Sequence, residues 1–176
     1  MTLLLAWGVV GADPADAQIR AWTAHGWIGA SHIGNPGFFT FFTNGKIELK
    51  PTVSPGPGTS TLRYNVVAVD GLYEPTTATG FRLVVRYKDT SPDAKIVVKL
   101  IETDIAFTGT ETVKLTFDSS TKPDSPNYQS QQASACGAFI FQTKAYRLEV
   151  AFTQTPSATS AAKLGVHGFI LHRANC

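Results

Sequence analysis

Apolar and polar residues alternate with a period of two in run after run of this chain, and this pattern constrains its fold most. The runs cover residues 60–69, 81–88, 94–102, 110–117, 136–143, 145–153 and 163–172. A period of two is that of a β-strand with one buried and one solvated face. Eleven Phe residues and many Val and Thr favour strands as well, and no amphipathic helix is evident in the sequence. The chain is therefore expected to be all-β.

About eight or nine such strands pack most simply as two antiparallel sheets, face to face. A length of 176 residues, of which 43% are hydrophobic, suits one domain, expected over 18–176. We expect a β-sandwich of the jelly-roll type. An immunoglobulin-like sandwich is the alternative, although its Cys…Trp…Cys pattern is absent from the sequence.

One hairpin is expected where Asn44-Gly45 joins the run FFTFFT to KIELK. Asn-Gly is the strongest short signal for a two-residue type I′ turn, because both central positions need a positive φ. That turn would place Phe42 opposite Ile47. By composition, the polar segment 118–135 is expected to be a long loop.

A second hairpin is expected from 81–88 and 94–102, joined by DTSPD, and its outward residues are mostly basic. With outward residues of other strands, the basic set is Arg63, Arg82, Arg86, Lys88, Lys95, Lys99 and Lys114. On a single sheet they would attract an acidic polymer. The alternatives are a solvated face that protects sheet edges, or contact with a partner protein. Nucleic acid is not expected, because no aromatic residue interleaves with these cations.

Four aromatic residues in segments interpreted as loops are candidate platforms for a sugar ring: Trp22, Trp27, Tyr73 and Tyr128. Flat aromatic rings can pack against the apolar face of a pyranose. Alternatively, the two Trp residues close one end of the core, which is usual for such residues.

Cys136 and Cys176 are the two cysteines of the chain, and we expect them to form a disulfide, as in secreted proteins. Two separate buried thiols are the alternative. Residues 3–12 form an apolar run, followed by Ala15-Asp16-Ala17, which suits a signal peptide over 1–17. Because no Lys or Arg precedes the run, a buried N-terminal strand is the alternative. A run of this length is too short to span a membrane.

No cofactor is expected. Two kinds of metal site are the alternatives. Asp residues near turns could hold calcium at an edge of the sandwich: Asp70, Asp89, Asp93, Asp118 and Asp124. The four histidines, His25, His32, His167 and His172, have no carboxylate near them in sequence. The local motifs of common enzyme classes are absent, and nothing pairs the acids available for glycoside hydrolysis: Glu74, Glu102, Asp104, Glu111 and Glu149.

The block YNVVAVDGLYEP…GFRLVVRYK…AKIVVKLIETD…TETVKLTFDSS, followed by CGAFIFQTKAYRLEVAF, resembles secreted bacterial β-sandwich proteins of uncharacterised role. It is also similar to carbohydrate-binding jelly rolls. The resemblance covers about 60–172 and rests on strand pattern, so it assigns no site residue. It implies a secreted or cell-surface, non-catalytic domain that binds a glycan or acidic polymer. A self-assembling subunit of a filament or surface layer, built by strand addition, and a hydrolase are the alternatives.

Overall fold

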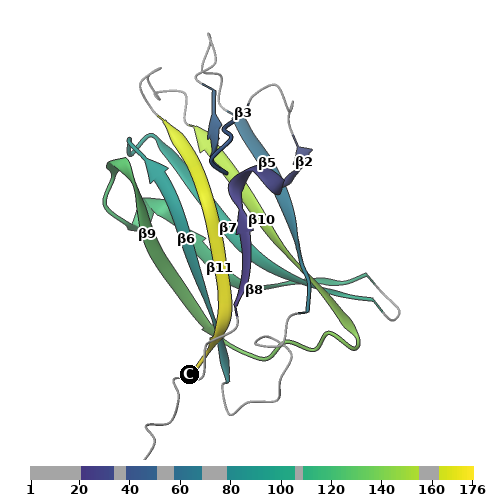
Figure 1. Cartoon of the computed structure of the whole chain (residues 1–176). Helices are drawn as coiled ribbons and strands as arrows, with labels where there is room; N and C mark the ends of the chain where they lie inside the picture. The colour runs from purple at the N-terminus through teal and green to yellow at the C-terminus, as the bar shows by residue number, and fades with distance from the viewer. Residues whose placement is uncertain (1–20, 34–38, 51–57, 69–78, 106–108, 155–162) are drawn as a thin grey trace, which may run out of the picture.

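The computed structural model describes residues 21–33, 39–50, 58–68, 79–105, 109–154 and 163–176 (Figure 1). Sheet A contains β1 (Trp22–His25), β3 (Phe39–Phe41), β4 (Ile47–Leu49), β6 (Gly80–Asp89), β9 (Ser125–Cys136) and β11 (Leu164–Ala174). Sheet B contains β2 (Ala30–Ile33), β5 (Gly58–Val66), β7 (Ala94–Asp104), β8 (Glu111–Asp118) and β10 (Lys144–Gln154). Two single turns of 3₁₀-helix, η1 (Gly26–Ile28) and η3 (Ser119–Thr121), are the helical elements of these residues. None of the described helices is long or apolar enough to cross a membrane.

The strand order identifies the architecture as a jelly roll. Within sheet A the order is β3-β4-β11-β6-β9, with β1 also paired to β11, and within sheet B it is β2-β5-β10-β7-β8. From β4 onward, every connection crosses from one sheet to the other except the step from β7 to β8, which pair in sheet B. This is the two-sheet, double Greek-key arrangement of a jelly roll, so the predicted fold class is confirmed.

The inward positions of the alternation are buried on β6 and β7, whereas Val113 of β8, an inward position by the same alternation, is 50% exposed beside a register shift. Seven residues from β6 and β7 have no solvent exposure: Phe81, Leu83, Val85, Tyr87, Ile96, Val98 and Leu100. They belong to one apolar core between the sheets, where Tyr87 and Phe117 pack edge to face at 5.2 Å between ring centroids. Burial of apolar surface on this scale is the main stabilisation of such a fold.

The second predicted hairpin is wrong, because β6 and β7 lie in different sheets. The DTSPD connection carries the chain across the edge of the sandwich, so β6 pairs with β9 and β11, and β7 pairs with β8 and β10. Period-two alternation reports which face of a strand is buried. It does not report the hydrogen-bonded neighbour, and a hairpin and a crossing connection have the same inward pattern.

The hairpin at Asn44-Gly45 exists, but its register differs by one residue from the prediction. Phe41 pairs with Ile47, and the loop contains a turn in which the Gly45 N–H donates to the Phe42 carbonyl at 3.0 Å. Gly45 alone has a positive φ, of 86°, within this loop. A type I turn followed by a left-handed glycine therefore replaces the two-residue type I′ turn.

The segment 118–135 was expected to be a loop, and most of it is strand β9. This strand lies at the edge of sheet A and pairs with β6, and its Ser, Gln and Ala side chains are too small or polar to give a strand signal. The expected strand 136–143 contains turns instead. Phe139 and Phe141 of this segment stack at 5.4 Å and pack against Tyr146, which explains their apolar character without a strand.

The predicted disulfide joins Cys136 at the end of β9 to Cys176, with 5.6 Å between the Cα atoms. The bond links the two strands that flank β6. Residues 1–17 lie outside the described residues, so the signal peptide and its alternative stay predictions.

Candidate ligand-binding site on the outer face of sheet A

The seven predicted basic residues do not form one continuous face. Arg82, Arg86 and Lys88 lie on β6 and face outward from sheet A. The other four lie on strands of sheet B: Arg63, Lys95, Lys99 and Lys114. Because the two sheets are packed face to face, their outer faces are on opposite sides of the domain (Figure 1).

On sheet B most cations are paired with acids of other strands of the sheet, and Lys99 is the one of these four without such a pair among the described residues. Arg63 contacts Glu149 at 3.1 Å, and Lys114 contacts Glu102 at 3.6 Å. Further pairs join Lys95 to Asp118, Lys144 to Asp104, and Arg147 to Glu111. Opposite charges on adjacent strands stabilise a sheet modestly, by roughly 0.2–1 kcal/mol for each pair. This face therefore matches the solvated-face alternative.

These ion pairs include most of the acids considered above for glycoside hydrolysis: Glu102, Asp104, Glu111 and Glu149. Glu102 accepts a hydrogen bond from the Tyr146 hydroxyl at 2.8 Å in addition to its lysine contact. Burial and the adjacent Glu102 carboxylate raise the pKa of Tyr146, so the phenol remains a donor. Glu74 lies outside the described residues.

On sheet A the cations of β6 have no such partners. Among the described residues, no carboxylate lies within ion-pair distance of Arg82, Arg86 or Lys88. The Arg82 Nε atom is buried and has no hydrogen-bond partner among the residues that the structure describes. The outward acid on the described strands of this sheet is Glu48, and it accepts a hydrogen bond from the Tyr128 hydroxyl at 3.1 Å.

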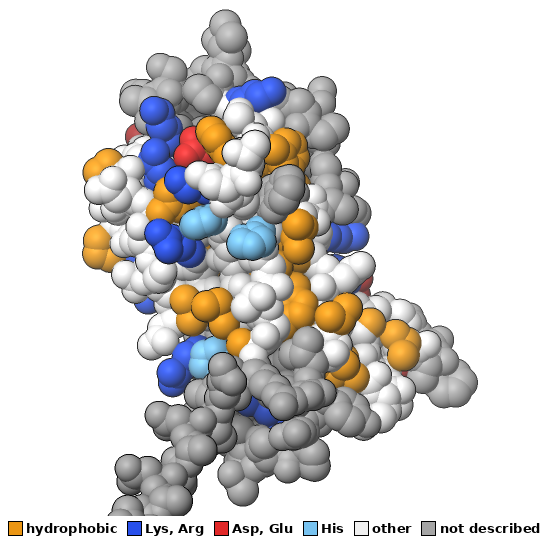
Figure 2. All heavy atoms as spheres, viewed as in Figure 1, with side chains coloured by type: hydrophobic (Ala, Val, Ile, Leu, Met, Phe, Trp, Pro, Cys, Tyr) orange, Lys and Arg blue, Asp and Glu red, His pale blue; other side chains and the backbone are white. Residues whose placement is uncertain are grey.

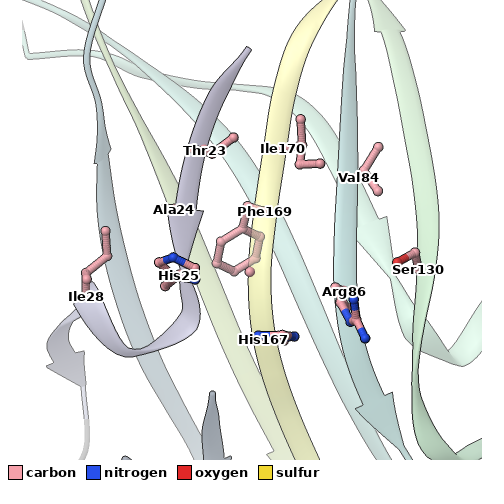
Figure 3. Close-up of a pocket in the computed structure, with 11 residues that line it drawn as sticks. Thr23, Ala24, His25, Ile28, Val84, Arg86, Ser130, His167, Phe169 and Ile170 are labelled. Carbon is pink, nitrogen blue, oxygen red and sulfur yellow. The ribbon is translucent and has the colours of Figure 1, made fainter. Parts of the chain in front are cut away.

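A hollow of about 350 Å³ lies on this outer face (Figures 2 and 3). Two rows of residues cross the strands beneath it. One row contains His25, Gly168, Arg86 and Ser130 from β1, β11, β6 and β9. The next row contains Thr23, Ile170 and Val84. The hollow therefore has a polar, cationic row beside an apolar one, and the exposed Ile28 of η1 adds to its apolar part.

A β-bulge in β11 shapes the hollow. The register shifts between Val166 and Gly168, so that Gly168 rather than His167 stands opposite Arg86. Bulges re-aim side chains and are common beside functional sites. Here the bulge places the glycine at the centre of the polar row, between His25 and Arg86, where a Cβ atom would lie 2.8 Å from the Ala24 carbonyl oxygen of β1.

His167 lines the hollow and is held by its neighbours. Its Nε2 lies 3.2 Å from the Asn44 carbonyl oxygen and so donates to it, while its buried Nδ1 has no partner. Burial and the nearby Arg86 charge lower the pKa of His167, so the ring is neutral at pH 7. The His25 ring lies 6.4 Å from the His167 ring, centroid to centroid.

Tyr128 lies beside the hollow and contacts His167 edge to face at 5.9 Å. Its side chain reaches from β9 across β6 and β11 toward β4, where Glu48 accepts its hydrogen bond. Gly165 permits this path, because a Cβ atom there would be 2.5 Å from the tyrosine oxygen. The Lys46 ammonium lies 4.9 Å from the ring centroid. Of the predicted aromatic platforms whose side chains the structure describes, Trp22 and Tyr128, Tyr128 lies beside the hollow, and its role in binding stays a prediction.

The other three aromatic candidates lie away from the hollow or outside the described residues. Trp22 is 6% exposed and packs in the core, as its alternative interpretation predicts. Nothing is described for the Trp27 side chain or for Tyr73. The sequence did not mark Val84 and Ile170 as site residues, because outward apolar residues on a strand carry no signal of their own; only strand order reveals that they are adjacent.

Two of the Asp residues considered for calcium, Asp89 and Asp118, have structural partners in the β6–β7–η3 region, and Asp70 lies outside the described residues. Asp89 is 1% exposed and accepts hydrogen bonds from the Ser119 hydroxyl and the Ser91 N–H. Asp118 caps η3 by accepting from the Ser120 N–H at 2.9 Å. The described residues contain no group of three or more His, Cys, Asp or Glu residues able to hold a metal ion.

No family model and no curated protein matches this chain. Solved structures with a similar arrangement include the CBM36-1 domain of a multidomain xylanase from the hindgut metagenome of Trinervitermes trinervoides. It has 11% identity and a TM-score of 0.45, with 89% of this chain and 100% of that chain covered. The xylan-binding module CBM15 has 10% identity and a TM-score of 0.47, with 89% and 97% covered. These values record a likeness of fold, and the site described above rests on the residues of this chain.

Proposed function

We propose that this domain is a non-catalytic carbohydrate-binding domain and that its ligand occupies the hollow on the outer face of sheet A. The observation that carries the proposal is the pairing of the two rows across β1, β11, β6 and β9. A pyranose ring has an apolar face of C–H groups and a rim of hydroxyls. A site for such a ring needs an apolar surface beside convergent hydrogen-bonding groups.

The two rows meet this requirement with side chains that are already exposed. Ile170 is 42% and Ile28 61% exposed, so a sugar ring packed against them would remove apolar surface from water. Arg86, His25 and Ser130 offer hydrogen-bonding groups on the adjacent row. No carboxylate lines the hollow among the described residues, whereas glycoside hydrolysis needs two of them across the scissile bond, which favours binding over hydrolysis.

A secreted or cell-surface location is part of the proposal. The Cys136–Cys176 disulfide supports it, because such bonds persist in oxidising compartments. Assembly by strand addition depends on the apolar N-terminal segment, which lies outside the described residues, so that alternative function stays a prediction.

The test is binding to a panel of immobilised neutral and acidic polysaccharides, measured by affinity gel electrophoresis and calorimetry. Ser130→Trp places a large side chain in the hollow from an exposed position on β9. Thr116→Trp is the matched control, because Thr116 is exposed and lies opposite Lys99 on sheet B. We expect Ser130→Trp to abolish binding and Thr116→Trp to leave it intact, with both variants folded by circular dichroism. Equal loss in both variants, or no binding to any polysaccharide by the parent protein, would refute the proposal.

A further inference from the structure

We propose that the glycan held on sheet A is an acidic polysaccharide that follows β6, with Arg86 as the main contact for its carboxylate or sulfate groups. Arg82 and Lys88 would extend the contact on either side. This inference rests on the proposed carbohydrate-binding function and adds the chemical class of the ligand.

The first argument is the contrast between the two outer faces. Cations on sheet B are mostly neutralised by acids at distances of 2.6–3.7 Å, whereas those of β6 have no such acid within the part of the chain that the structure describes. Lys46 adds a further positive charge beside Tyr128. Unpaired charges of one sign on one face create a positive potential that attracts a polyanion.

The second argument is the spacing of these cations. Side chains on one face of a strand repeat every second residue, so Arg82 and Arg86 are about 13 Å apart along β6 and Lys88 is about 7 Å further on. A single small anion cannot contact sites this far apart. A linear polymer with an acidic group on successive sugar units can contact all three.

The third argument is the local environment of the two guanidinium groups. Val84 separates Arg82 from Arg86 on the outer face and, with Ile170, provides the apolar row of the hollow. A planar guanidinium beside apolar surface suits a bidentate contact with a carboxylate or sulfate group.

The same face argues against a nucleic acid as the ligand. Binding of single strands relies on aromatic rings on which bases stack. Tyr128 is the aromatic residue beside this cationic strip, and its ring is covered by Lys46 on one side and contacted by His167. Its hydroxyl is fixed by Glu48, so the ring is not a free platform.

The experiment compares polymers that share a backbone and differ in charge. Affinities are measured by calorimetry for polygalacturonate against its methyl ester, and for dextran sulfate against dextran, at low and at physiological salt. We expect each charged polymer to bind more tightly than its neutral counterpart, with affinity falling as salt rises.

Arg86→Gln removes one charge from the site, and Lys99→Gln removes one from the exposed face of sheet B. Loss of a charge-assisted contact should lower the affinity for the charged polymer about tenfold in Arg86→Gln. Lys99→Gln should change it less than about twofold, as expected for a remote, screened charge. A tenfold loss in both variants would show a general charge effect and overturn the assignment to β6.

Two further outcomes separate this inference from the proposed function. Equal binding of charged and neutral polymers, lost in Ser130→Trp but unaffected by Arg86→Gln, would overturn the acidic ligand and retain carbohydrate binding. Binding to none of these polymers or to the wider neutral panel would overturn both. Tighter binding to single-stranded DNA than to polygalacturonate of equal charge would overturn the inference in favour of a nucleic acid.

Discussion

Removal of one buried hydroxyl, in Ser119→Ala, tests how the chain is stabilised where it crosses between the sheets. Ser119 is 1% exposed and follows β8, and its hydroxyl donates to the Asp89 carboxylate at the end of β6. The same oxygen accepts from the Ile96 N–H of β7 at 2.9 Å. Three segments that meet at the β6–β7 crossing therefore depend on one side chain.

The expected cost follows from the groups that lose their partner. The substitution leaves the Ile96 N–H without an acceptor, and it leaves the Asp89 carboxylate with only the Ser91 N–H at 3.4 Å. A buried polar group left unsatisfied costs roughly 1–3 kcal/mol. Two polar groups lose a partner, and water entering the site would replace part of the lost bonding. We therefore expect the free energy of unfolding to fall by about 3 kcal/mol at pH 7. For a domain of this size the melting temperature should fall by about 6–12 °C.

The loss of stability in Ser119→Ala should also depend on pH, because the protonation state of Asp89 changes with pH. Burial raises the pKa of Asp89 above its ordinary value, so the folded protein binds this proton more tightly than the unfolded chain. The stability contributed by the neutral form is present at low pH and is lost as pH rises through the folded pKa. Without the Ser119 donor the ionised form is costlier still, so the gap between Ser119→Ala and the parent should narrow toward pH 4.

Urea unfolding monitored by circular dichroism at pH 7 and pH 4 measures both effects. Ser120→Ala is the control, because the neighbouring Ser120 is exposed and its hydroxyl bonds only to Asp118 in the described structure. It should cost less than about 0.5 kcal/mol. A loss below about 1 kcal/mol in Ser119→Ala at pH 7, or an equal loss at both pH values, would refute the reasoning.

Three further predictions concern the disulfide, Tyr128 and His167. Replacing both Cys136 and Cys176 by Ser opens a loop with a sequence separation of 40 residues, which should cost about 4 kcal/mol in urea unfolding by loop-closure entropy. An unchanged unfolding midpoint would contradict this. Tyr128→Phe deletes the 3.1 Å hydrogen bond to Glu48 at a half-buried site and should cost about 1 kcal/mol. Adding Glu48→Gln should then cost little more, and additive losses would argue against a coupled pair. At the proposed acidic-glycan site, affinity for polygalacturonate should rise as pH falls from 7 to 5, because His167 gains a proton while polymer carboxylates stay ionised. The pKa of His167 is lowered by burial and by Arg86, so most of the rise should occur below its ordinary value. The other titratable groups that face it are Lys46, Tyr128 and His25. His167→Gln should flatten the profile in calorimetry, and an unchanged profile would exclude His167 as its source.

Residue patterns identify some candidate site residues, but the site itself depends on tertiary structure. Arg86 and Tyr128 stand out in the sequence as an outward cation and a free-standing aromatic residue. Their proximity to His167 follows from β9, β6 and β11 being neighbours, although these strands lie far apart in the chain. The bulge that sets Gly168 opposite Arg86 has no local sequence signal, since one extra residue in a ladder is defined only by the partner strand.

The sequence by itself determined which side of most strands is buried, and through this it determined the all-β sandwich. Solvent imposes that pattern on each strand separately, so a period of two can be read residue by residue. Tertiary structure decided which strands are neighbours, because hydrogen bonding between strands uses backbone groups that every residue carries. The crossing between β6 and β7 divides the basic residues that appeared to form one face. It leaves Arg63, Lys95 and Lys114 paired with acids on sheet B, and it leaves Arg82, Arg86 and Lys88 on sheet A, where Arg86 lines the hollow.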